Sequence, residues 1–465
     1  MESGEFLREG RNLVTSGRPA KLRMSRCLAG FLRLGLRMTL SRRGKTMGVI
    51  AGLVALFLVA ILIMNVVSPE KRIERSLTHL YGIQDPQFVR ELGTMLGPPI
   101  LGGNRVVNLE NGAQIFPAML EAIRGAKRSI NFETYIYWSG AIGKQFASAL
   151  ADRARAGVPV HVILDWLGSQ KIDAAALQEM NEAGVHVARY HPLHWYSLSR
   201  INNRTHRKLL VVDGRIGFTG GVGIADPWDG DAAPPDHWRD SHYRLQGPAV
   251  AQMQAAFSDL WIKTTGEALQ GPEYFPEIPA DGSVSAQVFT SSPTGGADSM
   301  ELMVLLSLAA AERSIDLSAA YFVPDALTRR GLVDALARGV RVRILTPGEH
   351  VDAELVKQAS RATWGELLEA GAEIHTFSPT LFHCKLLIVD GHLVSVGSTN
   401  FDNRSFRLND EANLNVYDAE FAGRLTRVFE ADLARSRRVT LEEWRNRPAR
   451  EKALERLSAI FSKLL

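Results

Sequence analysis

The hydrophobic pattern of the chain begins with an apolar run, residues 47–67, which contains one polar residue, Asn65, and no charged side chain. About 20 apolar residues in a helix span the roughly 30 Å hydrocarbon core of a bilayer, so the run predicts a transmembrane helix. A buried globular helix is one alternative, and a cleaved signal peptide is another. The long segment ahead of the run and the lack of a small-residue cleavage site after it disfavour the signal peptide.

Charged residues flank this run asymmetrically. Residues 1–46 contain eleven basic and three acidic side chains, whereas the basic residues just after the run are diluted by Glu70 and Glu74. The positive-inside rule therefore places the amino terminus in the cytoplasm and residues 68–465 on the far side of the membrane. The basic stretch 22–40 is interpreted either as a helix that lies on anionic lipid or as a solvated tail.

Beyond the run, the pattern alternates between amphipathic segments and short β-branched segments. Helical periodicity over 141–156 and 326–338 ends in each case near a glycine. A strand rich in valine and isoleucine follows each helix, at 158–164 and 340–345. Alternation of this kind predicts an α/β fold in which a mixed sheet is flanked by helices.

These segments belong to an internal repeat, in which four pairs of similar segments keep an offset of 177 to 187 residues. The pairs are 126–130 and 311–315, 156–164 and 338–345, 182–187 and 369–374, and 206–214 and 383–391. The preserved order and spacing indicate a duplicated domain, so we expect two α/β sandwich halves related by a pseudo-twofold axis. The predicted divisions are a basic cytoplasmic segment (1–46), the transmembrane helix (47–67), a connecting region (68–112), the first half (113–265), a linker (266–296), the second half (297–440) and an amphipathic carboxy-terminal helix (441–465).

Composition and charge narrow the classes of function. With 46% apolar and 22% charged residues, the chain is neither disordered nor of low complexity. Its net charge of +4 is small and eleven of its basic residues precede the apolar run, so no nucleic-acid partner is expected. The two cysteines, Cys27 and Cys384, are too few and too far apart for a disulfide framework.

The pattern His-x-Lys-x4-Asp occurs once in each half. The two copies are His206, Lys208 and Asp213, and His383, Lys385 and Asp390. Each copy begins an apolar strand, in which side chains at i and i+2 share a face, so each histidine should project with its lysine into one pocket. The aspartates fall at the far end of each strand, before a glycine. They are included among the candidate catalytic residues, although their position favours a structural role, such as a hydrogen bond across the boundary between the halves.

Two imidazoles and two ammonium groups at one pseudo-twofold interface suit the cleavage of a phosphodiester. The lysines neutralise the non-bridging oxygens, one histidine attacks phosphorus, and the other protonates the leaving alcohol. No carboxylate cluster has the ligand spacing of Mg²⁺ or Zn²⁺, so no metal or other cofactor is expected. A nucleophilic histidine needs an acceptor that orients its ring, and the candidates are Asp240 and Glu411, downstream of the first and second motifs. Their alternative interpretation is a pair of solvated loop carboxylates.

The two motifs and several further segments resemble the phospholipase D superfamily, and more closely its bacterial cardiolipin synthase branch. The further segments are Phe132–Tyr137, Trp238–His242, Tyr321–Pro324 and Gly397–Phe406. The resemblance runs from about Phe116 to Val439, which is nearly all of the chain beyond the apolar run.

This resemblance implies roles for individual residues. It implies that His206 is the nucleophile, that His383 is the general acid and that Asn400 contacts the phosphate. The candidate substrate-binding and orienting residues are Asn400, Ser398, Gly221, Asp240 and Glu411. The chain departs from the family at Gly223, where an asparagine is usual, and the loss of one donor there would weaken transition-state binding.

The activity that the resemblance implies is transfer of a phosphatidyl group from one phosphatidylglycerol to another, giving cardiolipin and glycerol at the bacterial cytoplasmic membrane. A phospholipid hydrolase that uses water instead of an alcohol is the first alternative. A nuclease and a non-catalytic lipid-binding scaffold are less favoured, the scaffold because both motifs are intact. A bilayer is the expected partner, and the oligomeric state is left open. The aromatic loop 194–198 and the apolar stripe 453–465 are interpreted either as core packing or as membrane contacts.

Overall fold

The computed structural model describes residues 42–66, 73–192, 202–293 and 298–460. The chain separates into two compact units, Met1–Ile61 and Leu62–Leu465. The aromatic loop 194–198, the last five residues of the stripe 453–465, and the predicted cytoplasmic segment up to residue 41 lie outside the described residues.

A single helix, α2 (Arg42–Val66), forms over the predicted apolar run. Its described apolar side chains are largely exposed, with Leu56 at 68% and Phe57 at 59%. Among the residues that the structure describes, no helix combines the length and the apolarity needed to cross a membrane. The helix therefore lies where the sequence predicts one, and its passage through a bilayer stays a prediction.

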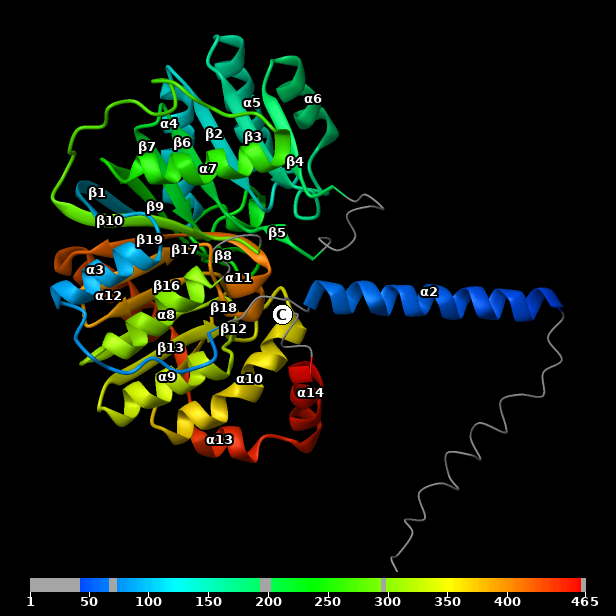
Figure 1. The fold of residues 1–465 in the computed structure, drawn as a ribbon, viewed down its shortest axis with the longest axis vertical. Helices are drawn as coiled ribbons and strands as arrows, with labels where there is room; N and C mark the ends of the chain where they lie inside the picture. Colours follow the sequence, from blue (N-terminus) through cyan, green and yellow to red (C-terminus); the bar gives the residue numbers. More distant parts are fainter. Residues whose placement is uncertain (1–41, 67–72, 193–201, 294–297, 461–465) are drawn as a thin grey trace, which may run out of the picture. The chain divides into compact units, whose positions relative to one another are not determined.

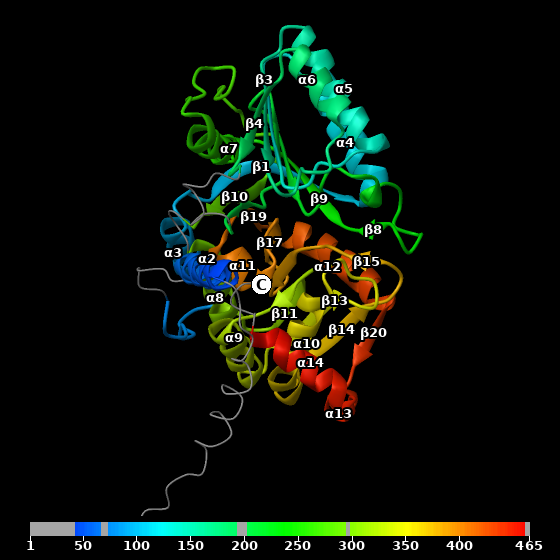
Figure 2. The same cartoon turned by 90° about the vertical axis from the view of Figure 1, so that its right-hand side faces the viewer.

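The first half of the larger unit contains a mixed sheet with helices on both faces. Its elements are α4 (Asn111–Gly125), β2 (Ile130–Thr134), α5 (Ala141–Arg155), β3 (Val160–Asp165), α6 (Ala174–Glu182), β4 (His186–Tyr190), β6 (Leu209–Val212), β7 (Ile216–Gly220), β9 (Ser241–Gln246) and α7 (Val250–Thr265). In space the strands follow the order β4-β3-β2-β6-β7-β9, in which β2, β3 and β4 are parallel and the other pairs are antiparallel. Figure 2 shows α4, α5 and α6 on one face of this sheet and α7 on the other.

The second half repeats this arrangement (Figure 1). Its elements are α8 (Ser299–Ala310), β11 (Ser314–Ser318), α9 (Ala326–Ala337), β13 (Arg341–Pro347), α10 (Glu354–Glu369), β14 (Glu373–Phe377), β16 (Leu386–Val389), β17 (Leu393–Gly397), β19 (Asn409–Tyr417) and α12 (Ala419–Ala434). The strand order β14-β13-β11-β16-β17-β19 has the same sequence of parallel and antiparallel pairs as the first half. The predicted α/β fold with a mixed sheet flanked by helices is confirmed.

Two central strands join the halves into one 16-stranded sheet. β1 (Leu101–Glu110) pairs with β9 and with β10 (Val284–Ser291), and β10 pairs in turn with β19. Both joining strands lie in segments that the sequence predicts to be a connecting region and a linker. Gly102 and Gly103 interrupt the alternation of β1. β10 alternates apolar and polar residues over 284–288, but it directly follows a stretch rich in proline and glycine that the sequence predicts to be a linker. The remaining short elements are α3 (Pro86–Met95), η2 (Asp226–Trp228), β12 (Phe322–Val323), β18 (Phe401–Asp402) and α11 (Asn403–Arg407).

The carboxy-terminal region contains two helices where the sequence predicts one. After the edge strand β20 (Ser436–Val439), α13 (Leu441–Asn446) and α14 (Ala449–Ile460) are separated at Pro448, whose ring cannot continue a helix. The α14 helix packs on α10. Two residues of the predicted apolar stripe, Leu454 and Leu457, are 44% and 58% exposed, so core packing does not account for them.

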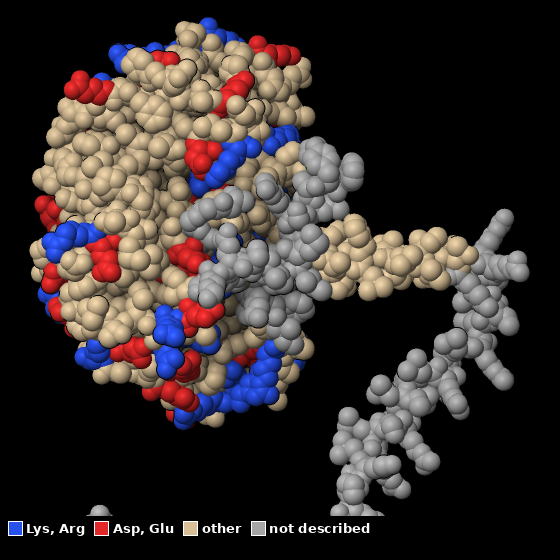
Figure 3. All heavy atoms as spheres, viewed as in Figure 1, with Lys and Arg blue, Asp and Glu red and all other residues tan. Residues whose placement is uncertain are grey.

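The three larger clusters of buried apolar side chains are one in each half and a third beneath α7 and α12. The third cluster joins the halves, because Val211 and Leu245 of the first half pack there with Leu414 and Phe421 of the second. On the face shown in Figure 3, basic and acidic side chains are interspersed rather than separated by sign. The central strands and the third cluster belong to both halves, so they determine how the two motifs face one another.

Candidate active site

Each motif histidine follows a two-residue strand that crosses into the other half. The crossing strands are β5 (Arg204–Thr205), which pairs with β19, and β15 (Leu381–Phe382), which pairs with β8 (Trp238–Arg239). The main-chain N–H of His206 then donates to the carbonyl of Asp410 at 2.9 Å, and that of His383 to the carbonyl of Arg239 at 2.8 Å. In both cases the next residue of the partner strand is a carboxylate.

Those carboxylates contact the imidazole rings reciprocally across the halves. Nδ1 of His206 lies 3.0 and 3.1 Å from the two oxygens of Glu411, and Nδ1 of His383 lies 2.7 Å from Oδ2 of Asp240. The carboxylate downstream of the second motif therefore orients the first histidine, and the carboxylate downstream of the first motif orients the second. These contacts suit the tautomer in which Nδ1 donates its proton to the carboxylate and Nε2 carries a lone pair for a substrate.

Burial determines the charge state of this group. Desolvation lowers the pKa of His206 to about 4 and also lowers the pKa of His383, so both rings are neutral near pH 7. Burial alone would raise the pKa of Glu411 and Asp240, but the neighbouring histidines and lysines outweigh it and lower both values. Neutral rings beside ionised carboxylates favour the tautomer with the proton on Nδ1 and a lone pair on Nε2.

The motif lysines lie on the same strand face as the histidines. The Nζ of Lys208 donates to the carbonyl of His206, and the Nζ of Lys385 to the carbonyl of His383, each at 2.6 Å. Burial lowers the pKa of Lys208 to about 7 and lowers that of Lys385 as well. A desolvated ammonium interacts strongly with an anionic substrate, because few water molecules screen it.

The motif aspartates lie apart from this group. Asp213 accepts main-chain N–H bonds from residues 127–129, and Asp390 accepts them from residues 312–314. Both residues have positive φ, 56° and 54°, at the end of their strands. Each aspartate therefore stabilises, through these hydrogen bonds, the turn that precedes the first strand of its own half. The expectation of a hydrogen bond across the boundary between the halves is wrong, since each aspartate accepts these bonds from residues of its own half.

The orienting carboxylates are supported differently in the two halves. Ser398 donates to Oε2 of Glu411 at 2.5 Å. At Gly221, a Cβ atom would lie 2.2 Å from Oδ1 of Asp240, so a side chain there is excluded. The indole N–H of Trp228 donates instead to Oδ2 of Asp240 at 3.0 Å. Sequence reasoning did not find Trp228, which lies outside both motifs.

A similar asymmetry surrounds Asn400 and Gly223. Asn400 lines the active cavity, and its Oδ1 accepts the main-chain N–H of Tyr321 at 3.3 Å. A Cβ atom at Gly223 would lie 2.8 Å from Cβ of Ile136 and 3.2 Å from the ring of Trp228. These two apolar side chains fill the space that an asparagine would need.

One cavity of about 280 Å³ is lined by both motif histidines and by Lys208, but Lys385 is not among its lining residues, so the expected pairing of histidine and lysine in the pocket holds for the first motif only. Its lining includes His206, Lys208, His383 and Asn400 from the sequence prediction, and also Tyr135, Arg204, Trp228, Trp238, Tyr321, Asp352 and Arg404. Of the added residues, Tyr135, Trp238, Tyr321 and Arg404 belong to segments that resemble the phospholipase D superfamily, whereas Arg204 and Asp352 have no signal in the sequence. Over the described ranges, no cluster of three or more histidine, cysteine or acidic side chains is arranged to bind a metal ion.

Two facing His/Lys motifs on a duplicated mixed sheet are the arrangement expected of a phospholipase D-type phosphodiester site. The family described as "Cardiolipin synthase, PLD-like domain" matches residues 119–261 and 304–433, more than half of the chain. The chain belongs to this family.

Curated relatives agree with this family, and a solved structure has a similar fold. The cardiolipin synthase of Geobacillus kaustophilus (strain HTA426) is 34% identical over 370 residues, which cover 79% of this chain and 74% of that protein. The major cardiolipin synthase of Bacillus subtilis (strain 168) is 35% identical over 365 residues, covering 78% and 76%. A phosphatidylserine synthase from Haemophilus influenzae Rd KW20 has a similar fold, with a TM-score of 0.61 at 12% identity over 81% of this chain and 99% of that chain.

Proposed function

We propose that this protein is a cardiolipin synthase-type phosphatidyltransferase, which transfers a phosphatidyl group from one phosphatidylglycerol to another and releases glycerol. The observation that supports it most directly is the pair of histidines in one cavity, each with its Nδ1 oriented by a carboxylate from the opposite half. The relatives named above are cardiolipin synthases, and they match over most of their own length.

In the first step, Nε2 of His206 attacks phosphorus, and the bond from phosphorus to the headgroup oxygen breaks. His383 donates its proton to that oxygen, and glycerol leaves. Burial lowers the pKa of His383 in the empty cavity, and the negative charge of a bound phosphodiester opposes this effect and favours the protonated ring. Lys208 and Lys385 stabilise the charge on the non-bridging oxygens.

In the second step, a hydroxyl of the acceptor phosphatidylglycerol attacks phosphorus. His383 takes the hydroxyl proton, and the bond from phosphorus to Nε2 of His206 breaks. The histidines thus return to their starting protonation states. If water takes the place of the hydroxyl, the same intermediate gives phosphatidic acid and the protein is a hydrolase.

The proposed location is the bacterial cytoplasmic membrane, with α2 as a single-pass anchor and the catalytic unit on the non-cytoplasmic side. The exposed apolar side chains of α2 and the eleven basic residues ahead of them support this topology. A reporter enzyme that works only outside the cytoplasm should be active when it is fused to the carboxy terminus. Activity of a cytoplasm-specific reporter at that end would place the catalytic unit inside.

The activity is tested with purified full-length protein in mixed micelles of phosphatidylglycerol, in the presence of EDTA, with mass spectrometry of the lipids. Cardiolipin and free glycerol are the expected products. Phosphatidic acid alone would establish hydrolysis, and strict dependence on added metal would contradict the histidine mechanism. The variant His206→Ala should form no covalent phosphatidyl-enzyme, whereas His383→Ala should still form one from a lipid with a good leaving group.

A further inference from the structure

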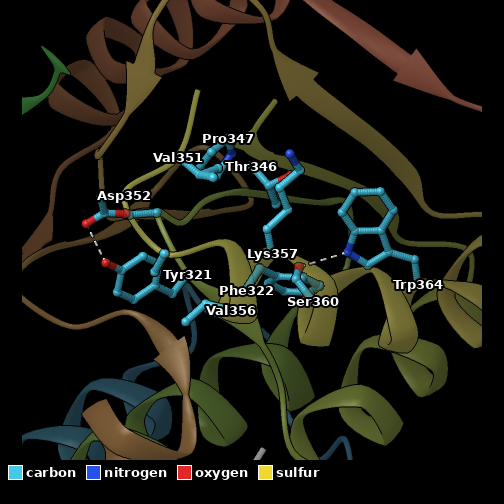
Figure 4. A pocket seen from close by; sticks show the side chains of 12 residues that line it. Tyr321, Phe322, Thr346, Pro347, Val351, Asp352, Val356, Lys357, Ser360 and Trp364 are labelled. Carbon is cyan, nitrogen blue, oxygen red and sulfur yellow. Dashed lines mark hydrogen bonds between the residues drawn. The ribbon is translucent and has the colours of Figure 1, made fainter. Parts of the chain in front are cut away.

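One carboxylate in the active cavity has no part in the mechanism above. Asp352 lies on the loop between β13 and α10 and lines the cavity together with Tyr321 and His383. The phenol of Tyr321 donates to Oδ2 of Asp352 at 2.6 Å, and Figure 4 shows the two side chains directed toward one another. Asp352 is exposed, and within the described part of the chain no protein group is hydrogen-bonded to its other oxygen, Oδ1. It is therefore an oriented acceptor at the wall of a phosphodiester site.

Asp352 lines the same cavity as His383, the histidine that exchanges a proton with the alcohol in the proposed mechanism. Burial lowers the pKa of His383 and Lys385, and the charge of Asp352 opposes that effect at both residues. The principal influences on the pKa of His206 are burial, Glu411 and the two motif lysines. A carboxylate in this cavity whose charge acts on His383 can contact the alcohol that leaves or enters there.

We infer that Asp352, oriented by Tyr321, is a specificity-determining residue that selects a polyhydroxyl alcohol by accepting a hydrogen bond from a hydroxyl that does not react. The inference rests on the proposed function and names the feature of the alcohol that its site recognises. A carboxylate only accepts hydrogen bonds, so it attracts a hydroxyl and repels the phosphate. The alcohol that leaves in the first step and the alcohol that enters in the second step occupy the same site. Asp352 can therefore bind the hydroxyl that does not react in both steps.

Other occupants of this position fit less well. An ammonium headgroup would also approach a carboxylate, but the cavity is lined by the cations Arg204, Lys208 and Arg404. Its second carboxylate, Asp402, already accepts the main-chain N–H of Ser405 and caps a helix. These three cations of the lining disfavour a cationic headgroup and favour a neutral polyol.

A lipid tail does not fit behind this pair either. The apolar cavity beside Asp352 and Tyr321, lined by Val351, Val356 and Phe322, has a volume of only about 20 Å³ (Figure 4). That is room for about one water molecule. The cavity therefore lies beside the Tyr321–Asp352 hydrogen bond and is too small to hold an acyl chain.

The test is a competition between alcohols for the phosphatidyl group. Full-length protein in micelles of phosphatidylglycerol receives equal concentrations of deuterated glycerol, 1-propanol and ethanolamine, and mass spectrometry gives the ratio of the three transfer products. Glycerol and 1-propanol both have a primary hydroxyl, and they differ in the further hydroxyls that Asp352 would bind. Loss of a hydrogen bond to a charged group corresponds to about tenfold or more in this ratio.

We expect the wild type to prefer glycerol, and Asp352→Asn to lower the ratio of glycerol to 1-propanol product by about tenfold. Tyr321→Phe, which removes only the hydroxyl that orients Asp352, should lower the same ratio by a smaller factor. The matched control is Glu349→Gln, which removes one negative charge from the same loop at an exposed residue that does not line the active cavity. It should keep the wild-type ratio. General damage to the fold lowers all three products together and leaves the ratio unchanged.

Three results would overturn the inference. The first is a wild-type ratio in Asp352→Asn while transfer to alcohols continues, which refutes the role of Asp352 and leaves the proposed function standing. The second is a preference of the wild type for ethanolamine over glycerol, which makes the site one for an ammonium group. The third is a wild type that forms phosphatidic acid and no alcohol product, which refutes the transferase function itself.

Discussion

Replacing Glu411 with glutamine tests how the ring of His206 is oriented and how much this orientation contributes to the rate. Both carboxylate oxygens contact Nδ1, at 3.0 and 3.1 Å, and Ser398 donates to Oε2. Glutamine keeps the shape of the side chain, but it has no charge and its amide nitrogen donates. Where that nitrogen faces Nδ1, the ring must bear its proton on Nε2, and the nucleophilic lone pair is lost.

The size of the effect follows from the positive charge that develops on His206 as it attacks phosphorus. A carboxylate about 4 Å from a unit charge contributes about 4 kcal/mol at an effective dielectric constant of 20. Loss of that stabilisation lowers the rate about a thousandfold. Asp240→Asn removes an equivalent charge from His383, the proposed general acid, whose Nδ1 lies 2.7 Å from the carboxylate.

The assay compares two lipids, phosphatidylglycerol and the p-nitrophenyl ester of phosphatidic acid. The glycerol leaving group needs a proton, whereas p-nitrophenolate leaves without one. Glu411→Gln should therefore slow the release of both leaving groups about a thousandfold. Asp240→Asn should slow the release of glycerol to a similar extent and that of p-nitrophenolate much less. Thermal unfolding of both variants checks that the fold is intact.

Two results of this assay would contradict the roles assigned to His206 and His383. Equal losses for the two variants on the p-nitrophenyl lipid would show that the histidines do not have distinct roles as nucleophile and acid. A Glu411→Gln protein with wild-type rates on both lipids would show that the carboxylate contact does not set the tautomer of His206.

Four further outcomes follow from individual residues. Asp390→Ala should lower stability in urea unfolding by about 1–3 kcal/mol, because it leaves main-chain N–H groups without an acceptor, and the folded fraction should keep its turnover number. Gly223→Asn should also destabilise the protein, by about 1–3 kcal/mol in thermal unfolding, because its Cβ would lie 2.8 Å from Ile136, and it should not raise the transfer rate. Burial raises the pKa of Glu133 from 4.5 to about 7, so between these pH values the folded state binds a proton that the unfolded state has lost. The free energy of unfolding should therefore fall by about 3 kcal/mol as the pH rises from 4.5 to 7. Glu133→Gln should reduce the difference between the unfolding free energies measured in urea at pH 5 and at pH 8. Because burial lowers the pKa of Lys208 to about 7, kcat/KM should decline above that pH as the ammonium loses its proton, and a constant kcat/KM up to pH 9 would contradict its role.

The parts of the site that follow local rules could be predicted from the sequence. The spacing of His206 and Lys208 on an apolar strand is enough to place both side chains on one face, and the second copy repeats the pattern. The alternation of helices and strands likewise predicts the mixed sheet, because each element buries one face.

The relation between the halves could not be predicted in the same way. Asp240 and Glu411 stand out as candidate orienters, but their assignment to a histidine depends on the two-residue strands β5 and β15, which cross between the halves and have no periodicity of their own. Trp228 can donate to Asp240 because Gly221 leaves space for that carboxylate and Gly223 leaves space for the ring. That space exists only once these segments pack together, so the sequence does not reveal it. Sequence spacing reports contacts within a segment and does not report which distant segment will lie beside it.

The reciprocal contact between each histidine and the carboxylate of the other half has the geometry of an isologous interface, as in a twofold-symmetric dimer, but within a single polypeptide. In a dimer of identical subunits, every substitution appears at both positions at once. Here each position can change independently, and the differences between Gly221 and Ser398, and between Gly223 and Asn400, are changes of that kind. Covalent linkage of the halves thus allows two chemically identical imidazoles to acquire unequal surroundings, which is what a nucleophile and an acid require.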